Sequence, residues 1–161
     1  MSCLYQIKSL TLHELPEIME IGRRAYNISW SAALMRDTLS ASHTKTWGIF
    51  DDVNSKCLGF AVLSMVIDES DLLMICIDPN YQRKGFGSKL LNFIIDNLKM
   101  TQVEKIHIEV RQSNNRAINM FKKHNFIRIG LREDYYPYAG KPINNNIGSG
   151  REDAIIMSLN F

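Results

Sequence analysis

The clearest pattern of apolar and polar positions in this chain lies between Leu72 and Asn97. A short continuous apolar run, Leu72–Ile77, ends at Asp78 and Pro79, and such a run predicts a strand covered on both faces. After a polar turn, apolar residues recur at helical spacing: Leu90, Leu91, Ile94, Ile95 and Leu98. This spacing places one apolar stripe along a helix of period 3.6. The pattern therefore predicts a central strand, a loop and a long helix.

The segments before the central strand predict strands and short helices. Tyr5 and Ile7 share one face of a first strand by period two. Thr11 and Glu14 form a capping-box pattern, so a helix should begin there and end near residue 27. Ser31 is a candidate N-cap of a second, short helix. Two apolar runs separated by turn-forming residues then predict an antiparallel hairpin: Thr46–Phe50 and Cys57–Ile67.

After the long helix the pattern predicts further strands and one more helix. Ile106, Ile108 and Val110 alternate with polar residues, which predicts a strand with His107 and Glu109 on its other face. Ser113 or Asn114 can cap a helix that runs to about residue 124. The last two predicted strands are Phe126–Arg132 and Asp153–Leu159. This order predicts an α/β chain with a mixed sheet and helices on its faces.

Composition fits one soluble globular domain spanning residues 1–161, with 45% hydrophobic and 22% charged residues. No apolar run approaches the roughly 18 residues of a membrane span, and no signal peptide is apparent. Three cysteines without paired spacing fit a reducing compartment, so we expect a cytoplasmic protein. The four histidines lack metal-ligand spacing, which predicts no metal site. A net charge of +2 gives no indication of nucleic-acid binding.

The loop between the central strand and the long helix has features of a phosphate-binding site. Gly85 and Gly87 let the backbone approach a ligand, the following helix presents free N–H groups, and Arg83 and Lys84 add positive charge. The segment Gly85–Lys89 lacks the P-loop spacing of Gly, four residues and then Gly-Lys-Ser/Thr, and Leu90 stands where a Rossmann fingerprint needs its third glycine. A second interpretation stays open, in which the glycines serve only the geometry of a turn.

This segment, Gln82–Gly87, resembles the central motif of the Gcn5-related N-acetyltransferase superfamily, Gln/Arg-x-x-Gly-x-Gly/Ala. Three flanking segments resemble its RimI-type subfamily, which acetylates the N-terminal alanine of small-subunit ribosomal protein eighteen: Ile75–Tyr81, Glu109–Asn114 and Arg151–Met157. The resemblance spans nearly the whole chain. It implies the fold of that superfamily, a mostly antiparallel sheet with a splayed parallel pair and helices on both faces.

The resemblance also implies acetyl-CoA as the co-substrate and a ribosomal protein N-terminus as the acceptor, with no nucleic acid or membrane partner. In the family, the strand holds the pantetheine and the thioester, with a backbone N–H near Ile77 facing the oxyanion, while the loop amides hold the pyrophosphate. The expected cofactor-binding residues are Ile75, Cys76, Ile77, Arg83, Lys84, Gly85, Phe86, Gly87, Ser88 and Asn114. Cys76 also fits a small apolar role in a buried strand, and Asn114 also fits a helix cap.

Glu109 matches the subfamily's general base, within its Glu-Val-Arg-x-Ser-Asn motif. An α-amino group has a pKa near 8, so removing its proton near neutral pH requires only modest help. The alternative for Glu109 is a structural ion pair with Arg111 or a lysine. Phe121 departs from the pattern, because the family has a tyrosine there as general acid. A thiol of pKa near 8.5 leaves tolerably as the thiolate, so a missing acid should cost less than it would for a departing alkoxide.

Tyr135, Tyr136, Tyr138 or a water could replace that acid, and the sequence assigns none of them. The resemblance further implies that residues 26–37 help to wall the acceptor site. The segment Gly140–Gly150 is longer than in the subfamily and has the composition of a surface loop. Acetylation of a lysine or a small amine, or acyl-CoA binding without catalysis, are the alternatives to N-terminal acetylation. The acceptor sequence and the oligomeric state are not determined by these patterns.

Overall fold

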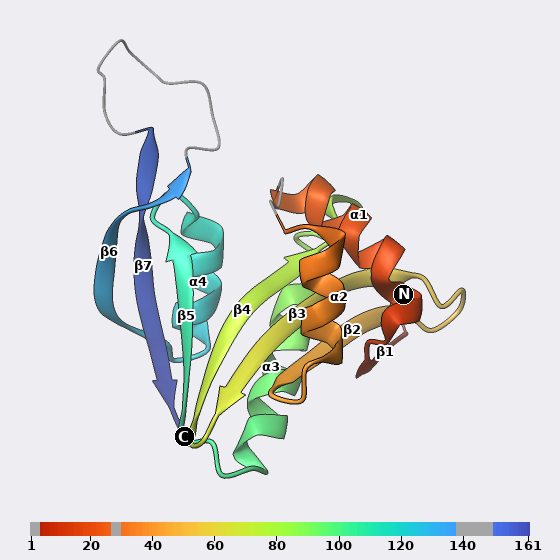
Figure 1. Cartoon of the computed structure of the whole chain (residues 1–161), viewed down its shortest axis with the longest axis horizontal. Coiled ribbons are helices and arrows are strands. Elements are labelled where there is room, and N and C mark those ends of the chain that lie inside the picture. The colour runs from red at the N-terminus through yellow and green to blue at the C-terminus, as the bar shows by residue number, and fades with distance from the viewer. Residues whose placement is uncertain (1–3, 27–29, 138–149) are drawn as a thin grey trace. The chain divides into compact units, whose positions relative to one another are not determined.

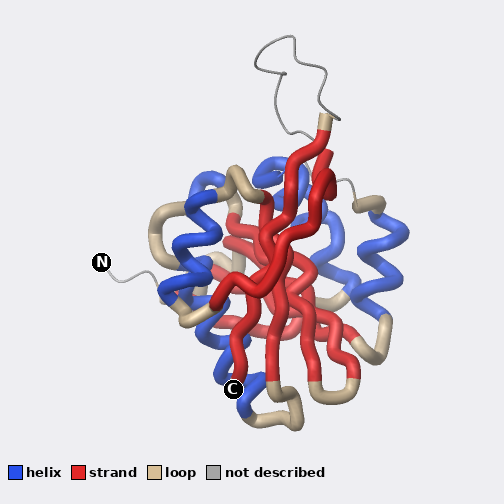
Figure 2. The backbone as a smooth tube through the Cα atoms, turned by 90° about the vertical axis from the view of Figure 1, so that its left-hand side faces the viewer, coloured by secondary structure: helices blue, strands red, loops and turns tan. Residues whose placement is uncertain are grey.

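The structure, a computed structural model, describes residues 4–26, 30–137 and 150–161. It divides into two compact units, Met1–Glu104 (unit one) and Lys105–Phe161 (unit two). Strands and helices joined by short loops make up most of the described backbone (Figure 2). In this part of the chain no helix is long and apolar enough to span a membrane. That one domain spans residues 1–161 stays a prediction.

Unit one is an antiparallel meander with helices packed on it. Its strands are β1 (Tyr5–Ser9), β2 (Thr44–Asp51), β3 (Cys57–Val66) and β4 (Glu69–Ile77), each paired antiparallel with the next. Its helices are α1 (Leu15–Tyr26), α2 (Ala32–Ser40) and α3 (Phe86–Lys99), with the 3₁₀ turns η1 (Leu12–Glu14) and η2 (Pro79–Tyr81). Helices α1 and α2 lie on one face of the strands and α3 lies on the other (Figure 1).

Local capping explains where the first two helices begin. The Thr11 hydroxyl accepts a hydrogen bond from the His13 N–H at 3.2 Å, and the Glu14 carboxylate accepts one from the Thr11 N–H at 2.7 Å. The predicted capping box is thus confirmed, although its first turn is the 3₁₀ turn η1. The Ser31 hydroxyl accepts from the Leu34 N–H at 3.1 Å, which confirms Ser31 as the cap of α2.

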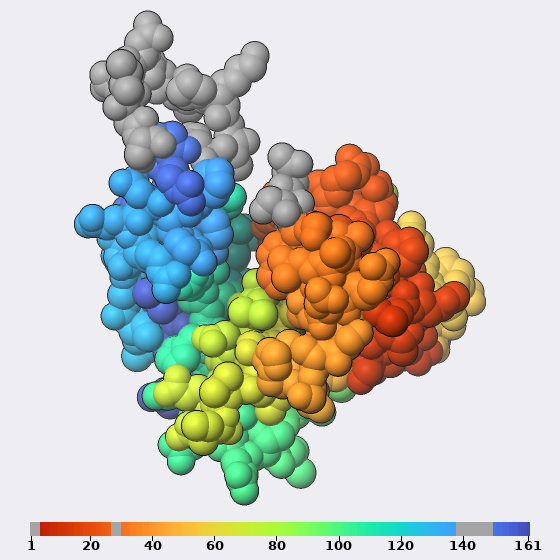
Figure 3. Space-filling model, in the orientation of Figure 1, coloured from red at the N-terminus to blue at the C-terminus, as the bar shows by residue number. Residues whose placement is uncertain are grey.

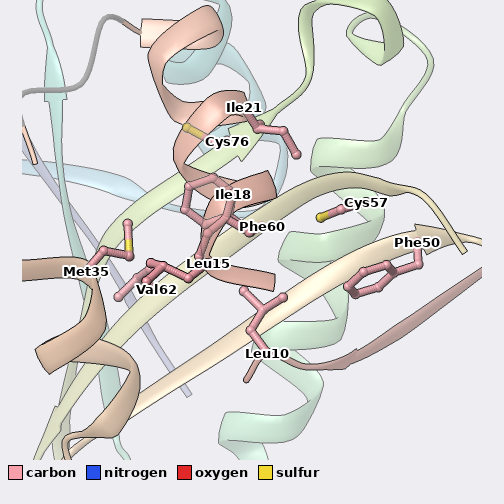
Figure 4. Packing of buried hydrophobic residues seen from close by; sticks show 10 residues of the cluster. All are labelled: Leu10, Leu15, Ile18, Ile21, Met35, Phe50, Cys57, Phe60, Val62 and Cys76. Atoms are coloured by element: carbon pink, nitrogen blue, oxygen red, sulfur yellow. The ribbon is translucent and has the colours of Figure 1, made fainter. Parts of the chain in front are cut away.

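The core of unit one joins α1 and α2 to the strands beneath them. Apolar side chains from both helices and from β2, β3 and β4 converge there (Figure 4). The cluster consists of Leu10, Leu15, Ile18, Ile21, Met35, Phe50, Cys57, Phe60, Val62 and Cys76. The two helices cover this side of the strands, as the red and orange atoms in Figure 3 show. On the other face, the predicted stripe of α3 is confirmed, since Leu90, Leu91, Ile94, Ile95 and Leu98 are all buried.

One prediction about the central strand is wrong. Leu73 is 46% exposed, so β4 is not covered on both faces along its length. The strand register explains this, because Leu63 pairs with Leu72 while Val62 pairs with Met74. Leu73 is therefore the extra residue of a β-bulge, which turns it away from the regular alternation. The apolar run in the sequence does not reveal such a bulge.

Unit two is a smaller antiparallel sheet with one helix. Its elements are β5 (Lys105–Arg111), α4 (Asn115–Lys123), β6 (Ile127–Pro137) and β7 (Arg151–Asn160). Strand β7 pairs antiparallel with both β5 and β6 and so lies between them. The predicted alternation of β5 is confirmed, because Ile106, Ile108 and Val110 are buried while the intervening residues are half-buried. Strand β6 extends five residues beyond the predicted end at Arg132.

Candidate active site

The turn after β4 in unit one is fixed by Asp78. This residue is only 1% exposed, and its carboxylate accepts hydrogen bonds from the Asn80 N–H at 2.9 Å and from the Arg24 guanidinium at 3.1 Å. Its own N–H donates to the Leu58 carbonyl at 2.9 Å. A buried carboxylate is costly unless its oxygens are satisfied in this way. Asp78 therefore ties α1 and β3 to the start of the loop that was predicted to bind phosphate.

The predicted loop has an open, positively charged geometry. Gly85 has a φ of +84° and caps the N-terminus of α3, and a Cβ added there would meet no atom within 4 Å. Arg83 also has a positive φ, of 63°, and both Arg83 and Lys84 are exposed. The first turn of α3 includes Gly87 and Ser88, both half-buried, while Phe86 is buried. A helix N-terminus with cations beside it suits a bound anion such as a pyrophosphate.

Further cations gather around the rings next to this loop. The ammonium groups of Lys84 and Lys56 each lie 5.1 Å from the ring centroid of Tyr81. The Lys89 ammonium lies 4.3 Å from the ring centroid of Tyr5. Neither Lys56 nor Lys89 is among the binding residues predicted from the sequence. Lys89 could have been found from its position in the first turn of the helix, but no sequence signal marks Lys56, which follows the turn between β2 and β3.

The three strand residues that were expected to hold the cofactor differ in their surroundings. Ile75 and Ile77 are half-buried, whereas Cys76 is fully buried and points into the core of unit one (Figure 4). Burial raises the pKa of the Cys76 thiol above its ordinary value, so the thiol stays protonated. The side chain of Cys76 thus has the apolar role that the sequence allowed. Only its backbone remains for a ligand.

Glu109 lies on β5 in unit two, on the polar face that the alternation predicted. Its side chain is 28% exposed, and Oε1 lies 3.0 Å from Nη2 of Arg132 on β6. The alternative expected from the sequence was an ion pair of Glu109 with Arg111 or a lysine. Glu109 does form an ion pair, but the predicted partner is wrong, because the cation is Arg132. Arg111 instead pairs with Glu152 on β7, with 2.8 Å between Nη1 and Oε1. Glu109 therefore combines a half-buried position with a cationic partner from two strands away.

Glu152 is the second carboxylate on this face of unit two. Burial alone would raise its pKa, but hydrogen bonds from Ser113 and Arg111 more than offset that effect. The pKa of Glu152 consequently lies below its ordinary value. Arg111 on β5 also donates a hydrogen bond to the Pro137 carbonyl on β6 at 2.7 Å. Together with its bond to Glu152 on β7, this contact joins all three strands. Their arrangement indicates a structural pair.

Tyr136 lies beside Glu109. Its hydroxyl donates to the Glu109 backbone carbonyl at 3.2 Å, and the Arg111 guanidinium lies 4.5 Å from its ring centroid. Burial, assisted by the negative charge of Glu109, raises the pKa of Tyr136 to about 12. The hydroxyl therefore keeps its proton near neutral pH. Tyr135 packs edge-on against Tyr136, with ring centroids 4.9 Å apart, and Tyr138 lies outside the described residues.

Two other sequence-identified residues lie on α4 or at its start. The Asn114 side chain accepts a hydrogen bond from the Ala117 N–H at 3.1 Å, which confirms its role as the helix cap. Phe121 is 1% exposed and its ring centroid lies 5.4 Å from that of Phe126. It is a packed core residue of unit two. Residues 27–29 of the expected acceptor wall and most of the Gly140–Gly150 segment lie outside the described residues.

The chain is similar to known proteins over nearly its whole length. The model of the acetyltransferase (GNAT) family matches residues 15–126. The [ribosomal protein bS18]-alanine N-acetyltransferase of Escherichia coli K12 is 36% identical over 154 residues, covering 95% of each chain. The enzyme of that name from Haemophilus influenzae is 33% identical over 158 residues, covering 98% of each chain.

Solved structures of acetyltransferases have the same fold as this chain. The crystal structure of the Escherichia coli ribosomal-protein-S18-alanine N-acetyltransferase superposes with a TM-score of 0.85 at 34% identity, covering 98% of this chain and 94% of that one. A GNAT family acetyltransferase from Elizabethkingia anophelis, with acetyl-CoA bound, gives a TM-score of 0.75 at 19% identity and covers 98% of each chain. The predicted fold class, an α/β mixed sheet of this superfamily, is confirmed.

Proposed function

The chain belongs to the acetyltransferase (GNAT) family, and we propose that it is a protein N-terminal acetyltransferase. The proposed reaction moves an acetyl group from acetyl-CoA to the α-amino group of the N-terminal alanine of ribosomal protein bS18, in the cytoplasm. The observation that carries this proposal is similarity, over nearly the whole chain, to relatives that are named for that reaction. The retained Glu109 and the retained Gln82–Gly87 loop agree with it.

Unit one would supply the binding of acetyl-CoA. The open turn at Gly85, the N-terminus of α3 and the exposed cations Arg83 and Lys84 fit a pyrophosphate. Backbone groups of Ile75–Ile77 would hold the pantetheine and the thioester, and we assign the oxyanion donor to a backbone N–H near Ile77. Acetyl-CoA supplies an acetyl group activated as a thioester. The tie between Arg24 and Asp78 keeps the strand end and the loop in place.

Unit two would supply the removal of the proton. The α-amino group of a peptide has a pKa near 8, so at neutral pH most acceptor molecules carry an ammonium. Glu109 is half-buried and ionisable, and it would take that proton directly or through a water. Tyr136 holds the backbone of Glu109 in place. No side chain is assigned as the acid for the departing thiol, since Phe121 has no proton to give.

The test of this assignment is Glu109→Gln, which keeps the size of the side chain and removes its charge. Transfer to a peptide beginning with alanine should fall about 10²-fold near neutral pH. The loss should shrink as the pH rises, because a growing fraction of the amine is then already deprotonated. The rate of CoA release measures transfer, and calorimetry with acetyl-CoA should give unchanged cofactor affinity.

Glu133→Gln is the matched control, because Glu133 is exposed on β6 of the same unit and the chemical change is identical. It should leave the rate unchanged. A Glu109→Gln protein as active as the parent at every pH would remove Glu109 from the reaction. An equal loss in the Glu133→Gln protein would show that the rate depends on net charge alone.

A further inference from the structure

The ion pair between Glu109 and Arg132 spans a whole strand of unit two. In the strand register, Glu109 on β5 is opposite Ile156 on β7, and Arg132 on β6 is opposite Ala154 on β7. Strand β7 therefore separates the two residues, and neighbouring strands are about 4.8 Å apart. Only a long side chain that lies across β7 brings the guanidinium to 3.0 Å from the carboxylate. Arg132 is the residue with that reach.

Small residues leave room for this crossing. Cross-strand partners in an antiparallel pair share one face of the sheet, so Arg132 and Ala154 lie on the face of Glu109. Ala154 presents only a methyl group there and is completely buried. Gly130, opposite Ile156, presents no side chain at all. The crossing therefore runs over Ala154, while the larger Ile156 on the same face packs over Gly130, where a Cβ would lie 3.4 Å from its Cδ1.

The two partners of this ion pair differ in how strongly the surrounding structure fixes them. The Tyr136 hydroxyl binds the backbone carbonyl of Glu109 and so fixes the strand at that residue. The Arg132 side chain is 51% exposed, and its guanidinium lies 4.6 Å from the ring centroid of Tyr135. The ion pair and this cation–π contact are present together, so the guanidinium keeps a favourable partner in Tyr135 when it leaves the carboxylate. The Arg132 guanidinium can therefore leave the carboxylate and return to it while the backbone of Glu109 stays in place.

From this geometry we infer that Arg132 occupies, in the free enzyme, the position that the ammonium of the acceptor takes on Glu109. The inference rests on the proposed function, in which Glu109 faces the α-amino group. A carboxylate already paired with a guanidinium is a poor partner for a second cation, because the two cations repel each other and compete for the same oxygens. Binding of a free N-terminus consequently requires one cation to replace the other. Arg132 is thus a specificity-determining residue that competes with the acceptor.

The test measures peptide binding in place of turnover. Calorimetry with CoA present would compare a peptide beginning with alanine with the same peptide acetylated at its N-terminus. Arg132→Gln should bind the free-amine peptide about two- to fivefold more tightly than the parent, the gain expected from removing a partly exposed competing ion pair. The acetylated peptide carries no ammonium, so its affinity should not change.

Two controls separate competition from general electrostatics. Arg128→Gln removes the same charge from the same strand and should leave both affinities unchanged. Arg132→Lys keeps a cation and should bind as the parent does. In a Glu109→Gln background the gain from Arg132→Gln should disappear.

An Arg132→Gln protein that binds the free-amine peptide equally or more weakly overturns the inference, as does an equal gain for the acetylated peptide. Failure of the proposed function would appear differently. In that case Glu109→Gln would leave the transfer rate unchanged, whatever Arg132→Gln does to binding.

Discussion

At the scale of single residues, Phe121 stands where the resemblance to the family predicts a tyrosine. Its ring is buried against Phe126, so a hydroxyl added at its edge would enter packed apolar surroundings. Phe121→Tyr should lower the free energy of unfolding by about 1–3 kcal/mol, the cost of a buried hydroxyl without a partner. The transfer rate should not rise, since a thiol with a pKa near 8.5 needs little help to leave.

Urea unfolding and the rate of CoA release together check this expectation. A Phe121→Tyr protein of unchanged stability and a rate at least tenfold higher would contradict it. Such a result would show that a hydroxyl at residue 121 reaches the reacting groups and acts there as an acid.

Tyr136 predicts a dependence of stability on alkaline pH. Its pKa is raised to about 12 in the folded protein, whereas a tyrosine in the unfolded chain has a pKa near 10. Between these values the unfolded state loses the proton first, so stability falls as the pH rises. Tyr136→Phe should remove this contribution. Urea unfolding from pH 8 to pH 11 should show a shallower decline for the variant, and parallel declines would refute the role of Tyr136.

Individual contacts show where sequence reasoning stops. Glu109 was placed on the correct face by the alternation of β5, and Asn114 was identified as a cap from its position before a helix. Arg132 could not be identified as the partner of Glu109. Their contact crosses β7, and β6 carries register shifts between Arg128 and Gly130 and beyond Arg132. Such irregular pairing depends on the assembled sheet, and no periodicity in the sequence reports it.

At the scale of elements, apolar periodicity predicted the segments well where one face packs against a core. The stripe of α3, the hairpin of β2 and β3, and the caps of η1 and α2 follow from local sequence. The bulge at Leu73 does not, because an apolar run looks the same with or without one extra residue. Lys56, which lies beside Tyr81, could not be predicted either, because it comes from a distant turn.

The element that joins β4 to α3 carries a prediction of its own. Gly87 lies in the first turn of α3, where a larger side chain would stand in front of the helix N–H groups. Gly87→Leu should weaken CoA binding at least about tenfold by calorimetry, which corresponds to roughly 1.4 kcal/mol. The fold should remain intact, because leucine favours a helix more than glycine does. Gly87→Ala, with a single methyl group, should have a smaller effect.

Unchanged CoA affinity in the Gly87→Leu protein would mean that this loop does not hold the pyrophosphate. The glycines would then serve only the turn between strand and helix. The transfer rate at saturating acetyl-CoA adds a second check, because a defect confined to cofactor binding should largely disappear there.

At the scale of the whole molecule, the proposed steps are divided between the two units. Proton removal is assigned to unit two and cofactor binding to unit one, with Asn114 of unit two the one exception among the predicted cofactor-binding residues. Variants in the two units should therefore differ in kind, with lost CoA affinity for Gly87→Leu and lost rate at unchanged CoA affinity for Glu109→Gln. The predicted resemblance to the acetyltransferase superfamily is confirmed, whereas the acceptor is a proposal that rests on similarity to named relatives.

The central claim is that the acceptor is a protein N-terminus. The most direct measurement incubates the protein and acetyl-CoA with a peptide that begins with alanine and contains a lysine, and locates the acetyl group by mass spectrometry. The same peptide with a blocked N-terminus serves as the control. We predict acetylation of the free α-amino group alone and none in the blocked peptide. Acetylation of the lysine, or no transfer to either peptide despite CoA binding, would contradict the proposed function.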